Sequence, residues 1–225
     1  MSYITKEMCQ VAISNLQLFH ANLKSLYEEH EMEFLDDIGR RNMLMSKPQE
    51  RYFANALQQH YPQTFNCGLT GQPDIIIPDL DKELECKITS PHRGGGWSLQ
   101  TDYETLKRKG SLDYLYVLCD SSFEKFAVFH FINLTTEDFR SPSPGSRGKV
   151  AMRLYKSLDK CRVLYGSITD NAQINLQKIK SKLQGADSDL TAEKKKKLLK
   201  SMDYWNKNSS YSFILEPAAD ESNHV

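Results

Sequence analysis

The first third of the chain repeats apolar residues with helical spacing. From residue 8 to about residue 29 they recur every three or four positions, which is the period of an amphipathic α-helix. This pattern predicts one long helix, followed by a second short helix over about 33–45. Ser46-Lys47-Pro48-Gln49 then resembles a capping box, with proline in the first turn, where its missing N–H is harmless. We therefore expect a third helix over about 47–60.

Shorter and denser apolar runs in the middle of the chain indicate β-strands. Residues 74–77 and 83–88 are two such runs on either side of a Pro/Asp-rich turn, which is a hairpin signal. Residues 112–119 and 126–134 are longer runs rich in Tyr, Val, Phe and Ile, as expected of core strands. The segment 98–109, between the two pairs, has the pattern of a helix that the following glycine would end.

Beyond residue 134 the chain becomes more polar. Residues 140–148 are rich in Pro, Ser and Gly and predict a loop, and 150–164 is expected to form a basic helix. Polar helices are expected over about 173–184 and 192–206, with a late strand at 210–215. Taken in order, these elements predict an α/β fold with a central mixed β-sheet flanked by helices, and with added helices at both ends.

The composition limits the class of protein. The chain has 225 residues, of which 40% are hydrophobic and 26% charged, an ordinary composition for one sizeable core. It contains no run of about 18 apolar residues, which a transmembrane helix needs, and its first residues lack the profile of a secretory signal. Five cysteines without a CxxC pair fit buried thiols in a reducing compartment. We therefore expect a single-domain, cytoplasmic globular protein with no membrane partner.

The formal net charge of zero conceals an asymmetry between two parts of the chain. Residues 1–90 hold 8 basic and 13 acidic residues, whereas residues 91–225 hold 21 basic and 16 acidic residues. The strongest basic excess lies in 140–162, where only Asp159 opposes the basic side chains of Arg140, Arg147, Lys149, Arg153, Lys156, Lys160 and Arg162. This arrangement suits a protein that grips a polyanion and holds a cation, although a solvated charged face would produce the same pattern.

The expected hairpin carries the residues that point to chemistry. If its strands pair symmetrically around the Asp79-Leu80 turn, Asp74 lies directly opposite Glu85, with Cβ atoms roughly 5 Å apart. Alternation along the second strand puts Glu83, Glu85 and Lys87 on one face. The other face is apolar and is expected to pack on the core through Leu84, Cys86 and Ile88. One face of the hairpin thus presents two carboxylates beside an ammonium group.

The carboxylates of Asp74 and Glu85 would repel each other at this distance unless a cation lies between them. Oxygen ligands with open coordination positions favour Mg²⁺, for which Mn²⁺ is the usual substitute. A lysine on the same face can orient or deprotonate a metal-bound water, and it can stabilise negative charge in a phosphoryl transition state. These groups are suited to metal-assisted hydrolysis of a phosphodiester. An exposed hairpin with ordinary surface charges is the alternative.

Pro73-Asp74, followed eleven positions later by Glu85-Cys86-Lys87, resembles the PD-(D/E)xK motif of a nuclease superfamily. The preceding Gly71-Gln72 and the apolar Ile75-Ile76-Ile77 also fit. So does the expected order of elements, which is a helix with an acidic residue, two strands, a helix and a strand. The resemblance implies a restriction-endonuclease-like core over about 46–134, with basic DNA-binding additions over about 135–225 in the same domain.

The resemblance also implies roles for individual residues. Asp74, Glu85 and the backbone carbonyl of Cys86 would be metal ligands, and Lys87 would activate the water. Glu50, on the helix before the motif, is similar to a catalytic acidic residue that many family members use to assist a second metal or to hold the lysine; a surface charge is the alternative. Glu83 is expected to be exposed or paired with a lysine rather than bound to metal.

Two segments after the hairpin offer groups that can contact DNA. The Gly-rich loop and the helix expected after it contribute His92, Arg93, Trp97, Gln100 and Lys107, although Trp97 equally fits packing at the start of that helix. The basic segment contributes Arg140, Ser143, Arg147, Lys149 and Arg153. Contacts to phosphates are expected more than contacts to bases, because most protein–DNA hydrogen bonds go to the backbone.

The motif and the basic second part together indicate a sequence-specific type II restriction endonuclease. Such an enzyme would hydrolyse double-stranded DNA with Mg²⁺ and leave 5′-phosphate ends. A homodimer would cut both strands, and a cognate DNA methyltransferase would be its genetic partner. A repair or recombination nuclease, such as a nickase or a junction resolvase, is the nearest alternative. A non-catalytic DNA-binding module on the same fold is the other.

Overall fold

A six-stranded mixed β-sheet organises the computed structural model, which describes residues 2–34, 38–69, 71–91, 97–145, 148–166, 191–193, 195–196 and 199–200. The strand order in the sheet is β1-β2-β3-β5-β6-β8. Strands β3 and β5 pair in parallel, and the other neighbours pair antiparallel. Helices pack against this sheet, so the predicted α/β fold with a mixed central sheet is confirmed.

Four of the sheet strands match the apolar runs seen in the sequence. They are β2 (Ile75–Ile77), β3 (Lys82–Thr89), β5 (Leu112–Cys119) and β6 (Phe126–Leu134). The turn between β2 and β3 is a short 3₁₀ helix, Pro78–Leu80, and Asp81 follows it in the left-handed region with φ of 51°. The edge strand β1 (Phe65–Asn66) was not predicted, because a run of two residues carries no alternation.

The N-terminal part forms two long helices rather than three. α1 (Lys6–Glu29) is as predicted and begins at Thr5, whose hydroxyl accepts a hydrogen bond from the Met8 backbone N–H. α2 (Ile38–Gln58) is continuous, so the predicted start of a helix at Ser46 is wrong and Pro48 lies inside the helix. Burial outweighs the cost of the proline. A proline inside a helix costs about 3 kcal/mol of stability. The buried side chains of Met45, before the proline, and of Phe53 and Leu57, after it, each contribute about 1.5–3 kcal/mol.

The segment 98–109 begins as a strand. β4 (Gln100–Asp102) pairs antiparallel with β7 (Lys149–Ala151) in a separate two-stranded sheet, so the predicted helix is wrong in its first half. α3 (Tyr103–Lys109) starts at Asp102, whose carboxylate accepts from the Thr105 N–H at 2.9 Å, and ends at Gly110 as expected. The partner strand of β4 is almost fifty residues away in sequence, so local spacing gave no sign of it.

The basic helix predicted over 150–164 is also wrong. The segment contains the end of β7, a single turn α4 (Leu154–Ser157), a 3₁₀ turn (Leu158–Lys160) and β8 (Cys161–Gly166). β8 pairs with β6 and is buried at Cys161 and Val163, so the main sheet continues well past residue 134. A further 3₁₀ turn, Thr136–Asp138, follows β6. Described residues within 192–200 are helical, whereas 173–184 and 210–215 lie outside the described residues.

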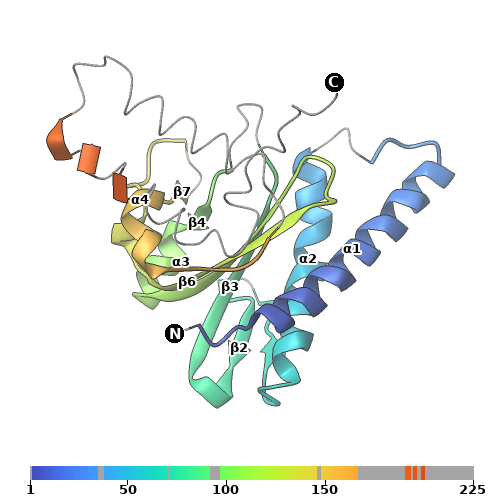
Figure 1. Ribbon diagram of the computed structural model, residues 1–225, viewed down its shortest axis with the longest axis horizontal. Helices are drawn as coiled ribbons and strands as arrows, with labels where there is room; N and C mark the ends of the chain where they lie inside the picture. The colour runs from blue at the N-terminus through green and yellow to red at the C-terminus, as the bar shows by residue number, and fades with distance from the viewer. Residues whose placement is uncertain are drawn as a thin grey trace, which may run out of the picture.

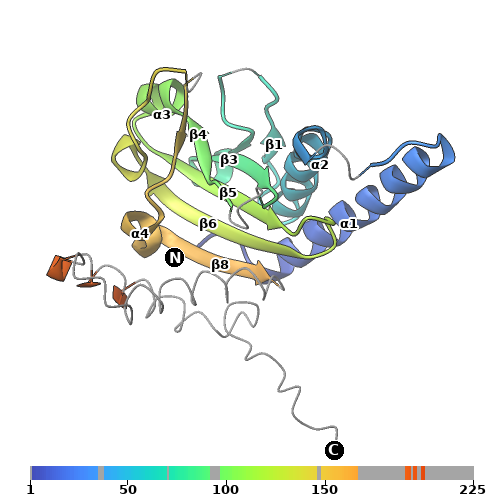
Figure 2. The ribbon, with the colours of Figure 1, turned by 90° about the horizontal axis from the view of Figure 1, so that it is seen from above.

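The sheet separates two apolar clusters. α1 and α2 lie side by side against one face, as Figures 1 and 2 show, and the larger cluster fills the space between them and the sheet. The second cluster lies on the other face, beneath α3 and the β4–β7 pair, and includes Tyr114, Tyr116 and Phe131. None of the helices in the described part of the chain has the length and apolar character needed to cross a membrane.

Candidate active site

The β2–β3 hairpin has the register predicted from its turn. Ile75 pairs with Leu84, and Ile77 pairs with Lys82. One step further along this register, Asp74 lies opposite Glu85. The carboxylate of Asp74 accepts a hydrogen bond of 2.8 Å from the backbone N–H of Cys86, which fixes it against β3. The two acidic residues are therefore neighbours on adjacent strands, as expected.

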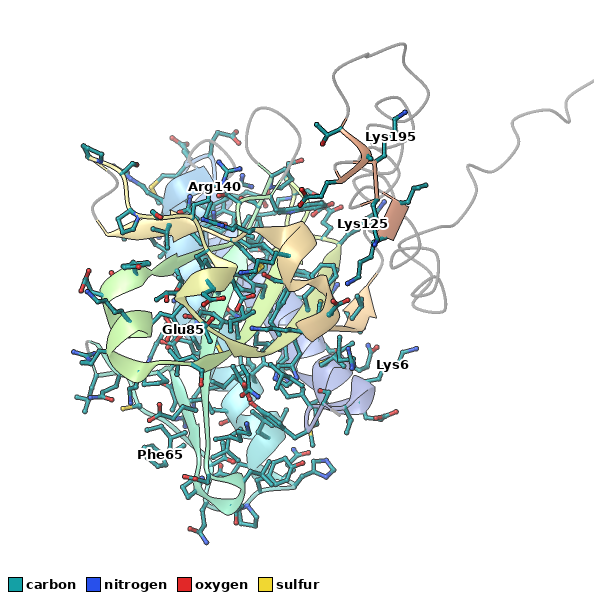
Figure 3. All side chains as sticks on the ribbon, turned by 90° about the vertical axis from the view of Figure 1, so that its left-hand side faces the viewer. Lys6, Phe65, Glu85, Lys125, Arg140 and Lys195 are labelled. Atoms are coloured by element: carbon teal, nitrogen blue, oxygen red, sulfur yellow. The ribbon has the colours of Figure 1, made fainter. Side chains whose placement is uncertain are left out.

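The two faces of β3 differ as its alternation predicted. Leu84 and Cys86 are buried in the cluster beneath α1 and α2. Glu85 and Lys87 lie on the opposite face and form an ion pair with each other. Glu83 shares that face but pairs with Lys109 at 2.7 Å, which is the pairing with a lysine that was expected of it. In Figure 3, Glu85 lies along the hairpin above Phe65 and below Arg140.

The electrostatics of the site show an excess of negative charge. Burial raises the pKa of the Asp74 carboxyl to about 7, and the neighbouring carboxylates of Glu85 and Glu50 add to the rise. Burial alone would lower the pKa of the Lys87 ammonium, but the charges of Glu85 and Asp74 outweigh it, and the pKa is raised. The ammonium is thus held in its charged form between two carboxylates, one of which holds its own proton unusually tightly.

Glu50 lies on α2 beside this pair but has its own set of donors. Its carboxylate accepts from the Lys47 ammonium at 2.9 Å, from the Ser46 hydroxyl at 3.3 Å and from the Asn66 amide at 3.4 Å. Glu50 is buried, so the expected alternative of an ordinary surface charge is wrong. The hydrogen bonds shown for it go to these three residues and not to Lys87, which is instead supported by Gln49 donating to its backbone carbonyl at 3.3 Å.

Asn66 is a site residue that the sequence did not reveal. Its amide donates to the backbone carbonyl of Asp74 at 2.8 Å and to Glu50, and its carbonyl oxygen accepts from Lys47 at 2.6 Å. It therefore joins α2 to the start of the hairpin. The only signal that could have indicated it is its position eight residues before Asp74, and that position has no meaning until β1 is known to pair with β2.

These residues surround an open cleft of about 580 Å³. Its lining combines α2, the loop before β2, the hairpin and the β4–α3 junction: Lys47, Glu50, Gly68, Leu69, Gly71, Gln72, Asp74, Glu85, Asp102 and Thr105. Gly71 has φ of +76°, which other residues rarely adopt, and a Cβ there would lie 3.1 Å from the Arg108 guanidinium. That guanidinium donates to the Gly71 carbonyl and ties the loop to α3.

The residues expected to contact DNA fall into three groups. His92, Arg93 and Arg147 lie outside the described residues. Trp97 packs against the second apolar cluster and donates its indole N–H to the Cys119 carbonyl at 2.9 Å, which supports the packing alternative. The others are exposed, and they are Gln100, Lys107, Arg140, Ser143, Lys149 and Arg153. Lys149 pairs in register with Asp102, which lines the cleft, so this residue of the exposed set adjoins the cleft.

The carboxylates of Asp74 and Glu85 fit a hard divalent cation. Each has oxygen atoms that the shown hydrogen bonds do not use, and the raised pKa of Asp74 means that added positive charge would relieve repulsion between them. Within the described ranges, no group of three or more His, Cys, Asp or Glu side chains is gathered for a metal ion. The role expected for the Cys86 carbonyl stays a prediction.

Comparison with known proteins adds no relative. No model of a protein family matches the chain, and the search of curated proteins found no match.

Proposed function

We propose that this protein is a divalent-metal-dependent endonuclease with the PD-(D/E)xK arrangement, and that it acts as a type II restriction endonuclease on double-stranded DNA. The observation that carries the proposal is the position of Asp74, directly before β2, beside Glu85 on β3: both carboxylates line one cleft, and Lys87 pairs with Glu85. The order α2, β2, β3, α3 and β5 supports it, because it matches the order of elements expected around the motif.

The chain's residues would divide the work between binding and charge stabilisation. Asp74 and Glu85 would hold Mg²⁺, which would supply a Lewis acid for a phosphoryl oxygen and acidify a bound water. Lys87, charged and fixed against Glu85, would donate to the attacking water or to a phosphoryl oxygen, and would stabilise the negative charge that grows there. Cys86 N–H would keep the Asp74 carboxylate aimed at the cleft.

The proposed reaction consumes one water for each strand cut. The water oxygen forms a bond to phosphorus while the bond from phosphorus to the 3′ oxygen breaks. The 3′ oxygen leaves with the electron pair and takes up a proton, and the water loses one proton. The products are a 5′-phosphate and a 3′-hydroxyl, so no oxidant or other co-reactant is needed.

The exposed basic residues supply a binding surface for the DNA backbone. Lys149 on β7 pairs in register with Asp102 at the wall of the cleft, and Lys107 lies on α3, the helix that begins after Asp102. Arg140 and Arg153 lie on the segments that lead into and out of β7. Phosphate contacts of this kind fix the register of a duplex without reading its sequence. A homodimer, with one site for each strand, is part of the proposal.

The test is cleavage of plasmid and phage DNA by the purified full chain with Mg²⁺. We expect discrete fragments from the wild type. Asp74→Ala and Lys87→Met should still bind DNA but should not cut, whereas Glu83→Gln, on the same strand face but outside the cleft lining, should cut normally. Undiminished cutting by Asp74→Ala or Lys87→Met would overturn the assignment.

The form of the substrate separates this proposal from its nearest alternative. Discrete fragments from linear duplex, together with a neighbouring gene for a DNA methyltransferase, would support a restriction enzyme. Cutting confined to branched or nicked DNA would support a repair or recombination nuclease instead. Binding without metal-dependent cutting on any of these substrates would support a non-catalytic module.

A further inference from the structure

The Lys47 side chain lines the cleft and carries a positive charge, and 61% of it is exposed. It lies one turn before Glu50 on α2, a spacing at which side chains meet on a helix surface, and its ammonium contacts the Glu50 carboxylate at 2.9 Å. The ammonium also donates to Asn66 at 2.6 Å, and Asn66 is itself bonded to the backbone of Asp74. Lys47 is therefore held from two sides beside the carboxylates proposed to bind metal.

We propose that the site takes a single divalent cation, held by Asp74 and Glu85, and that the Lys47 ammonium is a built-in second positive charge at the position beside Glu50 that a second cation would otherwise take. This inference rests on the proposed function and specifies it. It also replaces the expectation that Glu50 assists a second metal.

The hydrogen bonds of Glu50 leave little room for another cation. Of its two oxygens, Oε2 accepts from Lys47 and Asn66, and Oε1 accepts from Ser46. Only 11% of the side chain is exposed. A carboxylate offers about four acceptor sites, so three donors occupy most of it. A metal ion at Glu50 would have to displace the Lys47 ammonium.

Asp74 and Glu85 are less fully occupied. In the part of the chain that the structure describes, the Asp74 carboxylate has one donor, the Cys86 N–H, and the Glu85 carboxylate has one, the Lys87 ammonium. Unused oxygen atoms on two neighbouring strands are what a hydrated Mg²⁺ needs, since it binds one or two carboxylates and keeps several waters. The difference in donor number thus separates a metal-binding pair from a carboxylate that already has its cation.

The charge balance also favours one ion. With their carboxyl groups ionised, Asp74, Glu85 and Glu50 carry −3, and Lys47 and Lys87 carry +2, which leaves −1. One divalent cation brings this to +1, and one phosphodiester group then makes the complex neutral. A second cation would leave +3 in a half-buried cleft before substrate binds, which repulsion between like charges opposes.

The test counts Mn²⁺ ions bound to the full chain without substrate, by calorimetry and by electron paramagnetic resonance of the free ion. The wild type should bind one Mn²⁺ per chain. Lys47→Met keeps the length of the side chain but removes its charge, and it should bind a second, weaker Mn²⁺. Lys109→Met, which breaks the matched pair with Glu83 outside the cleft lining, should still bind one.

A second variant tests the same point without adding a site. Glu50→Gln should change the Mn²⁺ dissociation constant by less than about 3-fold, whereas Asp74→Asn should weaken binding by about 10-fold to 100-fold, as expected for a ligand or its direct support. Circular dichroism and urea unfolding would establish that each variant is folded.

The outcomes separate the inference from the function on which it rests. Two ions in the wild type, a single ion in Lys47→Met, or a large loss of affinity in Glu50→Gln would each overturn the inference while the nuclease proposal stands. A folded wild type that binds no Mn²⁺ would overturn both. One ion in the wild type with two in Lys47→Met would support both.

Discussion

Two buried or half-buried aspartates of this chain have opposite surroundings. Asp138, which is 2% exposed, accepts from the Thr135 N–H and hydroxyl, from Ser157 and from the Lys160 ammonium. Among the described residues, the Asp74 carboxylate accepts from the Cys86 N–H alone, and it lies beside another carboxylate. Both side chains are shielded from solvent, but the hydrogen bonds shown give Asp138 several donors and Asp74 a single one.

The pKa values of the two carboxyls record this difference. Burial alone would raise the pKa of Asp138, but hydrogen bonds from Lys160 and Thr135 hold it below its ordinary value. Burial and the charge of Glu85 raise the pKa of Asp74 to about 7. A buried acid whose hydrogen bonds are satisfied stabilises the fold, whereas one left with spare oxygens next to a like charge is a candidate for function.

The largest expected effect is on catalysis. Asp74→Asn should lower the rate of DNA cleavage by about 10³-fold or more, because the variant loses a proposed ligand of the metal that the reaction needs. Asp138→Asn should leave the rate per folded molecule close to that of the wild type. Single-turnover cleavage measured at saturating enzyme would check both, and equal losses in the two variants would remove the functional distinction between the aspartates.

Removal of Asp138 should have the larger effect on stability. Asp138→Ala should lower the free energy of unfolding by about 3 kcal/mol, because it leaves the N–H of half-buried Thr135 without its acceptor and removes the carboxylate that the Ser157 hydroxyl and the Lys160 ammonium contact. Asp159→Ala, which breaks an exposed pair with Lys200, should cost less than about 0.5 kcal/mol. Urea unfolding would measure both, and similar costs would contradict the account of Asp138.

Magnesium should raise the stability of the folded protein only when residue 74 is aspartate. A cation that binds only the folded chain adds about 1.4 kcal/mol to the free energy of unfolding when its concentration is about ten times its dissociation constant. The wild type and Glu83→Gln should therefore show a higher melting temperature with Mg²⁺ at about pH 8, and Asp74→Asn should not. An equal shift in Asp74→Asn would place the ion elsewhere.

The smallest effect concerns pH. The pKa of Asp74 is about 7 in the folded chain, against an ordinary value of 3.8, so between these values the folded chain binds more protons than the unfolded chain. The contribution of this group therefore makes stability fall as pH rises from about 4 to about 7. Asp74→Asn should remove that slope and add about 1 kcal/mol at pH 8, after allowance for partial solvent screening.

Urea unfolding between about pH 4 and about pH 8, without metal, would test the slope. Asp138 provides the contrast, because its lowered pKa gives stability that is present above the ordinary carboxyl range and is lost only in acid, as pH falls through that lowered value. Parallel stability profiles for the wild type and Asp74→Asn would contradict the raised pKa of Asp74.

The parts of the fold that could be predicted from the sequence are those set by nearby residues. The Asp79-Leu80 turn fixed the hairpin register, and alternation along β3 then separated Glu85 and Lys87 from Leu84 and Cys86. β5 and β6 could be predicted because both are long runs rich in β-branched and aromatic residues, which are enriched in strands.

The errors lie where distant contacts decide the local structure. β4 is a strand because β7 pairs with it, and β8 is a strand because β6 does, although both segments have polar residues at helical spacing. Pro48 does not start a helix because the apolar side chains before and after it pack together on α1 and the sheet. Asn66 was missed for the same reason, since its partners come from α2 and from the backbone beside Asp74.

The placement of Glu85 and Lys87 on β3 has a consequence for how a misfolded molecule would behave. A strand turns every side chain to its other surface when it slips by one residue against its neighbour. Such a slip would place the charged side chains of Glu85 and Lys87 in the apolar core and would move Leu84 and Cys86 to the opposite face. If the proposed function holds, a molecule with the wrong register would lack the site and would be inactive rather than unspecific.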